Sequence, residues 1–251
     1  MNTDLSINQQ LPIFGKSLCT NGKRIRHADC HQCVIRKKML FANLDLEQLD
    51  GLLEPISNLL VSPGAGLYRQ GDTGIALYSV RKGLVKLTQV APDGFERIVH
   101  LAGPGSTIGM EGFLHKKYRQ TAEAVTEADI CAIPVDVAQR IADSQPVLYH
   151  GLLENWQQQF EQAESWMLEL TQGPVKQRLA RLLLMLDRVG QTHGEIRLLN
   201  NQDSAGILAT TVETVSRNLA EFKRNSVITK VAPATYQLDL KQLQQIAATR
   251  E

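Results

Sequence analysis

Long apolar segments are missing from this 251-residue chain, which contains no run of about 18 apolar residues. A membrane-spanning helix is therefore not expected. Met1 to Pro12 is polar and lacks the apolar centre of a signal peptide, so we expect a cytoplasmic protein with no membrane partner. Cysteine is scarce, at four residues, and a reducing compartment disfavours structural disulfides. Metal binding or redox chemistry is then the expected role of the thiols.

Catalytic signatures are absent as well. The chain has no Gly-x-Gly-x-x-Gly ahead of a helix, no P-loop, no His-Glu-x-x-His and no Gly-x-Ser-x-Gly. We therefore do not expect an enzyme. A thiol or iron-sulfur electron carrier stays open as an alternative of another class, although one Cys-x-x-Cys pair without a βαβ context is weak support for it.

Short strands punctuated by glycine fill the segment from about Leu44 to Val135. Pro92-Asp93-Gly94 between two apolar runs predicts a tight hairpin. This pattern is typical of a small antiparallel barrel or jelly roll. Since helical patterns follow it, we predict an α+β chain: an N-terminal antiparallel β-roll, a long helix and a C-terminal helical domain.

Apolar residues recur with heptad spacing between Pro146 and Leu170. The steps alternate between four and three residues: Tyr149, Leu153, Trp156, Phe160, Ala163, Met167 and Leu170. This spacing predicts a helix that pairs with a second copy of itself in a homodimer. A stripe that packs on the chain's own roll is the alternative. Gly173-Pro174 then ends the helix and provides a hinge.

The stretch from Asn201 to Leu219 has helix-turn-helix order. A short helix near Asn201, a turn near Ala209 and a second helix are expected, followed by two short strands that form a wing. Glu213, Ser216 and Arg217 are three and four residues apart, so a helix presents them together, and each suits a base edge or phosphate in a major groove. Thr211 and Lys223 complete the predicted DNA contacts. Between Lys176 and Lys230 the sequence has nine Lys or Arg and five Asp or Glu, although the net charge of the whole chain is only +1. The basic surplus therefore lies where DNA phosphates would be met.

This arrangement resembles the CRP/FNR superfamily of bacterial transcription regulators, and Val-Glu-Thr-Val-Ser-Arg is close to the FNR branch. The resemblance implies a β-roll of the cyclic-nucleotide-binding type, a winged helix-turn-helix that reads double-stranded DNA with TTGAT-like half-sites through Glu213, Ser216 and Arg217, and RNA polymerase as a partner. It divides the chain into a cysteine segment (1–43), a sensor roll (44–145), a dimerisation helix (146–172) and a DNA-binding domain (173–251). Ala209 stands where the family's turn usually has glycine, so a slightly altered turn is expected.

The cysteines extend the resemblance. Cys131 lies in a run similar to the FNR segment that holds one distant cluster cysteine, and Cys19, Cys30 and Cys33 supply three more thiols. The resemblance thus implies a 4Fe-4S cluster that senses oxygen, nitric oxide or redox state. The spacing departs from the family, because no cysteine follows the Cys30–Cys33 pair closely. Cys19, separated from Cys30 by ten residues, has to return through the Asn21-Gly22 loop to reach the pair.

Other roles for the thiols stay open. The same four thiolates suit a structural zinc site. Cys30 and Cys33 alternatively switch between dithiol and disulfide, with the basic residues between Lys23 and Lys38 lowering the thiol pKa. A haem held by His27 or His31 is a third alternative, and Cys131 taken alone reads as a small buried hydrophobe.

Cyclic AMP is not expected as a ligand. The cyclic AMP receptors of the superfamily hold the phosphate with an Arg-Ser-Ala type motif, because a buried anionic phosphate needs a positive partner. Here Gln120 falls at the arginine position and Arg119 is one residue away, which on a strand means the opposite face.

Overall fold

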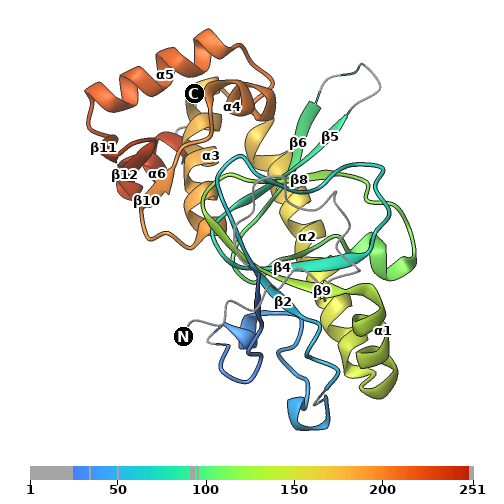
Figure 1. Ribbon diagram of the computed structural model, residues 1–251. Helices are drawn as coiled ribbons and strands as arrows, with labels where there is room; N and C mark the ends of the chain where they lie inside the picture. The colour runs from blue at the N-terminus through green and yellow to red at the C-terminus, as the bar shows by residue number, and fades with distance from the viewer. Residues whose placement is uncertain (1–24, 34, 50, 91–93, 95, 249–251) are drawn as a thin grey trace, which may run out of the picture.

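The computed structural model describes residues 25–33, 35–49, 51–90, 94 and 96–248 (Figure 1). An antiparallel β-roll is followed by a long helix and a small helical domain with a three-stranded sheet. The predicted α+β architecture is thereby confirmed. None of the helices in the described ranges is long and apolar enough to cross a membrane.

Two antiparallel sheets build the roll. One has the order β1-β2-β9-β4-β7 and the other β3-β8-β5-β6. The strands are β1 (Ile25–His27), β2 (Ser57–Val61), β3 (Gly66–Tyr68), β4 (Ala76–Lys82), β5 (Val85–Val90), β6 (Glu96–Ala102), β7 (Thr107–Ile108), β8 (Thr121–Ala124) and β9 (Ala128–Pro134). Short 3-10 turns lie at Arg36–Lys38, Leu46–Leu49 and Met110–Leu114. Alternation along β9 sends Ile130 and Ala132 into the roll interior, whereas Cys131 and Ile133 face outward into a second apolar cluster.

Three tyrosines fill part of the roll interior. The rings of Tyr68 and Tyr118 stack with centroids 4.0 Å apart, and the ring of Tyr78 lies 5.4 Å from that of Tyr68. The Tyr118 hydroxyl donates to the carbonyl oxygen of Ala76 at 2.7 Å. This stack is held by both packing and a buried hydrogen bond.

Two helices leave the roll: α1 (Val135–Ser144) and α2 (Val147–Leu170). The sequence predicted α2 and missed α1, which continues directly from β9. Helix α2 packs along the roll, and at its C-terminal end against the C-terminal domain, with one stripe of side chains. Its members follow one another at steps of four or three residues: Leu148, Leu152, Asn155, Gln159, Gln162, Trp166 and Leu170. The side chains of Gln159 and Gln162 donate to backbone carbonyls of the roll, so the middle of this contact is polar.

The C-terminal domain contains four helices and a sheet of order β10-β12-β11. Its elements are α3 (Val175–Gly190), β10 (Glu195–Arg197), α4 (Asn201–Ile207), α5 (Val212–Arg224), β11 (Ile228–Ala232), β12 (Thr235–Leu238) and α6 (Leu240–Ala248). The predicted helix-turn-helix and hairpin are present. Strand β10 and helix α6 were not predicted, because their three and nine residues give too little periodicity to read.

This domain is docked on the roll rather than tethered freely. Leu84 and Leu101 of the roll are buried in the same apolar cluster as the core of the C-terminal domain. Lys86 on β5 pairs with Asp203 on α4 at 2.9 Å and with Glu123 on β8 at 3.2 Å. The helix pair α4 and α5 therefore has a fixed orientation relative to the roll and α2.

Candidate DNA interface and thiol site

Helices α4 and α5 are each capped by their own sequence. The side chain of Asn200 accepts from the backbone N–H of Asp203 at 2.7 Å, and that of Thr211 accepts from the N–H of Thr214 at 3.2 Å. These caps satisfy backbone donors that a helix start leaves unpaired. Ala209, in the turn between the helices, takes φ 45°. The turn is thus made in the left-handed region by alanine itself, at a conformational cost that glycine avoids.

Helix α5 presents the predicted reading face. Glu213, Ser216 and Arg217 are all exposed, while Val215, Leu219 and Phe222 are buried against the domain. Val212, in the first turn of the helix, is 42% exposed. Hydrogen bonds from its own backbone N–H and from the Thr211 hydroxyl lower the pKa of Glu213. Glu213 is therefore a carboxylate, an acceptor, at neutral pH.

The two flanking residues predicted to contact DNA differ in placement. Thr211 is the N-cap of α5 and is exposed, with its hydroxyl also 3.0 Å from that of Thr214. Lys223 is exposed at the last turn, and its ammonium lies 4.8 Å from the centroid of the Tyr236 ring on β12. This cation–π contact ties the end of α5 to the wing.

Three of the four cysteines lie within the described residues, and none of the three is in a disulfide. Cys30, from the N-terminal segment, and Cys131, from β9, are buried in one apolar cluster. Cys33 is half-buried, with its sulfur 3.9 Å from that of Met39. Cys19 lies outside the described residues. The fold thus brings a thiol from the N-terminal segment onto the outer face of the roll sheet, beside the distant thiol.

Burial controls the chemistry of these thiols. It raises the pKa of Cys30 to about 11, reinforced by Cys33 and Asp29 and opposed by Arg81 and Arg36. Burial likewise raises the pKa of Cys131, with Cys30 as the next cause. The expectation that nearby basic residues lower the thiol pKa is wrong for Cys30. A metal-free Cys30 is a protonated thiol at neutral pH and a poor nucleophile.

Arg81 was not singled out from the sequence, although it lies beside both thiols. It lowers the pKa of Cys30 and Cys131, and its Nη1 contacts Asp129 Oδ2 at 3.1 Å. Its Nε is buried and has no hydrogen-bond partner among the described residues, and neither has Oδ1 of Asn58. Asn58 is the residue on β2 that pairs with Cys131. Arg81 is thus paired with Asp129 but keeps a buried Nε–H without a partner, and an anionic, thiolate-bound group could accept from such a donor.

The thiols suit a thiolate-ligated cluster in kind, and two of them, Cys30 and Cys131, are buried in one apolar cluster. Within the described residues, no three His, Cys, Asp or Glu side chains converge closely enough to hold a metal ion. Cys30, Cys33 and Cys131 would be three ligands and Cys19 the fourth. Because thiols bind metals as thiolates, binding would have to release the protons that burial now favours.

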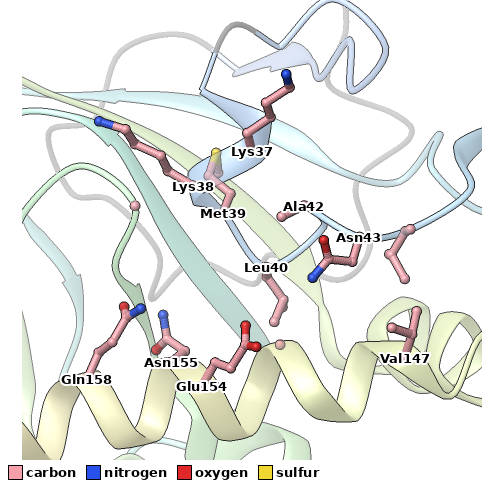
Figure 2. Close-up of a pocket in the computed structure, with 13 residues that line it drawn as sticks. Lys37, Lys38, Met39, Leu40, Ala42, Asn43, Val147, Glu154, Asn155 and Gln158 are labelled. Atoms are coloured by element: carbon pink, nitrogen blue, oxygen red, sulfur yellow. The ribbon is translucent and has the colours of Figure 1, made fainter.

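The segment after the cysteines lies across α2. Figure 2 shows Leu40 pointing toward the helix and Lys37 and Lys38 above it, around a hollow of about 120 Å³. A Cβ added to Gly151 of α2 would lie 3.1 Å from the carbonyl oxygen of Leu40. Lys38 donates to the side chain of Gln191 at the end of α3, at 3.1 Å. This lysine therefore joins the N-terminal segment to the end of α3.

The predicted dimer seam is an exposed apolar stripe in its middle part. Leu153, Trp156, Phe160 and Met167 are 64%, 56%, 56% and 62% exposed, and Ala163 is half-buried. Leu170 differs: it is fully buried in its own chain, in the cluster with α3, because the helix ends against the C-terminal domain. It therefore leaves the predicted interface. Tyr149, at the other end, packs edge-on against Phe113 of its own chain.

Gln120 stands at the position that corresponds to the phosphate-binding arginine of cyclic AMP receptors, and no cation faces the roll interior there. Arg119 is exposed, and its backbone N–H donates to the carboxylate of Glu111 at 3.4 Å. Gln120 is half-buried and has no charge. The stacked tyrosines lie inside the roll, in the same apolar cluster as Ala122 of β8.

Comparison with known proteins agrees with this architecture. Residues 59–145 match the cyclic nucleotide-binding domain family, and residues 177–246 match the Crp-like helix-turn-helix domain family. The anaerobic regulatory protein of Haemophilus influenzae is 27% identical over 222 residues, covering 85% of this chain and 84% of the relative. The transcriptional activator protein Anr of Pseudomonas protegens is 28% identical over 222 residues, covering 86% and 91%.

A solved structure shares the fold along most of its length. The crystal structure of a CRP-family transcriptional regulator from Thermus thermophilus has a TM-score of 0.64 and 26% identity, covering 76% of this chain and 96% of that one. The roll, the long helix and the winged helix-turn-helix define a DNA-binding transcription regulator, not an enzyme. The chain belongs to the CRP/FNR superfamily.

Proposed function

We propose that this regulator senses oxygen, nitric oxide or redox state through a 4Fe-4S cluster held by Cys19, Cys30, Cys33 and Cys131. The observation that carries the proposal is the burial of Cys30 and Cys131 in one cluster, although 100 residues separate them in the chain. The names of two relatives, which describe anaerobic regulation, support it. A cysteine that only packs in the core needs no second thiol beside it, so the shared burial of two thiols favours ligation over packing alone.

The chain's own residues would prepare this site. The Arg81 guanidinium would offset the negative charge of four thiolates, and its unpaired Nε–H would donate to a bound sulfur atom. Burial of Cys131 would limit access of water. When bound, the cluster supplies reactivity toward oxygen and nitric oxide that the protein alone lacks. Thiol switching receives less support, because the pKa of Cys30 is raised.

Serine in place of Cys30 or Cys131 is expected to abolish the cofactor, since a hydroxyl is a poor ligand for iron in such clusters. Protein purified without oxygen should show a band at about 400 nm and about four irons per chain, and should bleach in air. Ile133→Val is the matched control, because Ile133 is buried in the same apolar cluster on the same strand. Stoichiometric zinc without iron would instead identify a structural site, and a wild-type spectrum from Cys131→Ser would refute the ligand assignment.

For DNA, we propose that a homodimer reads a palindrome of TTGAT-like half-sites with Glu213, Ser216 and Arg217, and that Thr211 and Lys223 contact the backbone. The exposed position of all five side chains supports this reading. Two helices related by a two-fold axis would meet half-sites about one helical turn apart. RNA polymerase stays a predicted partner. The tip of the predicted Pro92-Asp93-Gly94 hairpin lies largely outside the described residues.

Replacing Arg217 with alanine is expected to weaken binding to the palindrome by about 5- to 150-fold, because a bidentate contact to guanine contributes about 1–3 kcal/mol of discrimination. Binding to an unrelated duplex should change much less. Fluorescence anisotropy with both duplexes at one salt concentration measures this difference. Arg224→Ala is the matched control, since Arg224 is exposed at the far end of α5. Equal losses on the two duplexes would make Arg217 a phosphate contact.

A further inference from the structure

A row of polar side chains crosses the outer face of the roll sheet and starts at Cys131. Ser79 on β4 pairs with Cys131 on β9, and on its other side Ser79 pairs with Thr107 on β7. Residues paired directly across antiparallel strands carry their side chains on the same face, close together. Ser79 and Thr107 are each fully buried. The row Cys131–Ser79–Thr107 is thus continuous across three neighbouring strands.

The two hydroxyls of this row satisfy each other. Ser79 Oγ and Thr107 Oγ1 are 2.8 Å apart, on the face of the sheet that also carries the apolar side chains of Leu77 and Ile133. Buried hydroxyls cost free energy unless they are hydrogen-bonded, so a pair of alanine and valine at these positions would be compatible with the same fold. The hydroxyl pair fixes the position of β7 relative to β4 beyond what packing requires.

Strand β7 lies at the edge of its sheet, and α2 pairs with that edge through side-chain amides. Gln159 Nε2 donates to the carbonyl oxygen of Thr107 at 2.7 Å. The amide of Asn155 lies 3.0 Å from both the carbonyl oxygen and the N–H of Thr107. In one orientation its Oδ1 accepts from Gln159 Nε2 at 2.7 Å; with oxygen and nitrogen exchanged, it would donate to the Thr107 carbonyl and accept from the Thr107 N–H. Asn155 is 7% exposed. Its amide therefore takes the place of a neighbouring strand.

Asn155 also adjoins the exposed stripe of α2. Trp156 is the next residue, and Leu153 and Phe160 lie on the exposed side of the same helix. A helix moves as a rigid rod over a few turns, so a shift at Asn155 rotates or translates these apolar side chains together.

We propose that Thr107 and Asn155 are positioning residues that connect the Cys131 thiol to the dimerisation surface of α2. This proposal rests on the proposed function, in which the ligand state of Cys131 changes. A change in the position of β9 at Cys131 passes to β4 at Ser79, to β7 through the hydroxyl pair and to α2 through the Asn155 amide. The connection thus begins at a thiol, Cys131, and ends at the apolar stripe of α2.

The first test compares DNA affinity before and after exposure to air. We expect the wild type to change by at least about tenfold. Thr107→Val, which removes the hydroxyl at nearly constant volume, should bind as much iron yet change by less than about threefold. Thr107→Ser, which keeps the hydroxyl, should restore the wild-type ratio. Gln162→Leu is the control, because Gln162 donates to the carbonyl of Leu101 and is not part of the row. A wild-type ratio in Thr107→Val would overturn the proposal.

The second test needs no cofactor, so it separates this proposal from the proposed function. In metal-free protein, the dimer dissociation constant is measured by sedimentation for Cys131→Ala, Ser79→Ala and the double variant. If the two residues are coupled, the fold-change of the dissociation constant in the double variant should differ from the product of the two single fold-changes by at least about threefold. For Cys131→Ala and Gln162→Leu, the fold-changes of the dissociation constant in the single variants should multiply to give the fold-change of their double variant. Independent effects in both pairs would overturn the connection, even if the wild type proved to contain iron.

Discussion

A chain with glutamate at both Leu153 and Phe160 should remain monomeric at concentrations where the wild type is a dimer. Both side chains are more than half exposed on α2, and they are three and four residues from Trp156 on one stripe. A two-fold pairing of this stripe would bury four added carboxylates without partners, and each buried charge costs several kcal/mol. We expect the dimer dissociation constant to rise at least about 100-fold, which corresponds to about 2.7 kcal/mol. Sedimentation velocity measures it directly.

Loss of the dimer should also reduce binding to the palindrome, because one chain can then contact only one half-site. Gln158→Glu is the control: it adds one negative charge at an exposed position of the same helix, between the two substituted positions but off the apolar stripe. If the double variant stays dimeric while Gln158→Glu behaves like the wild type, copies of this chain associate through another surface.

The reading helix could be predicted in detail because local rules decide it. Its caps, its turn and its buried face depend on residues within a few positions of one another, and the exposed positions of Glu213, Ser216 and Arg217 follow from helical periodicity alone. The heptad pattern of α2 also predicted the apolar stripe, but it did not predict at which residue the exposed part of the stripe ends. Leu170 continues the spacing and is buried by α3, an element that the pattern of α2 does not contain.

The thiol site shows the opposite case. Cysteine count and resemblance named Cys30, Cys33 and Cys131, yet no local pattern pointed to Arg81, Ser79 or Thr107. These residues lie near Cys131 only because β4 pairs with both β9 and β7, and strand order is a long-range property. The thiol-switch alternative assumed a lowered pKa for Cys30, and this assumption is wrong for the same reason. Basic neighbours in the sequence suggested a lower pKa, whereas burial dominates once the N-terminal segment packs on the roll.

Alanine at Gly103 is expected to separate the DNA-binding domain from the roll. Gly103 follows β6, and a Cβ added there would lie 1.8 Å from the carbonyl oxygen of Val189 near the end of α3 and 2.7 Å from its carbonyl carbon. Atoms this close cannot coexist, and the obstacle is helix backbone, not the end of a flexible side chain. Helix α3 must therefore move away. We expect a loss of about 3 kcal/mol in the free energy of unfolding, at the upper end of overpacking effects.

This substitution tests whether docking matters for DNA recognition. Moving α3 would weaken the Lys86–Asp203 contact and expose Leu84 and Leu101, so the orientation of α5 relative to α2 would no longer be fixed. Two half-sites must be met at one spacing, and a loosely held helix loses orientational entropy on binding. Affinity for the palindrome should fall more than affinity for a single half-site. Gly66→Ala is the control, since its nearest neighbour would be 3.8 Å away. Urea unfolding and hydrogen exchange at β6 and α3 measure the change; an unaltered exchange pattern would show that the roll does not hold the domain in place.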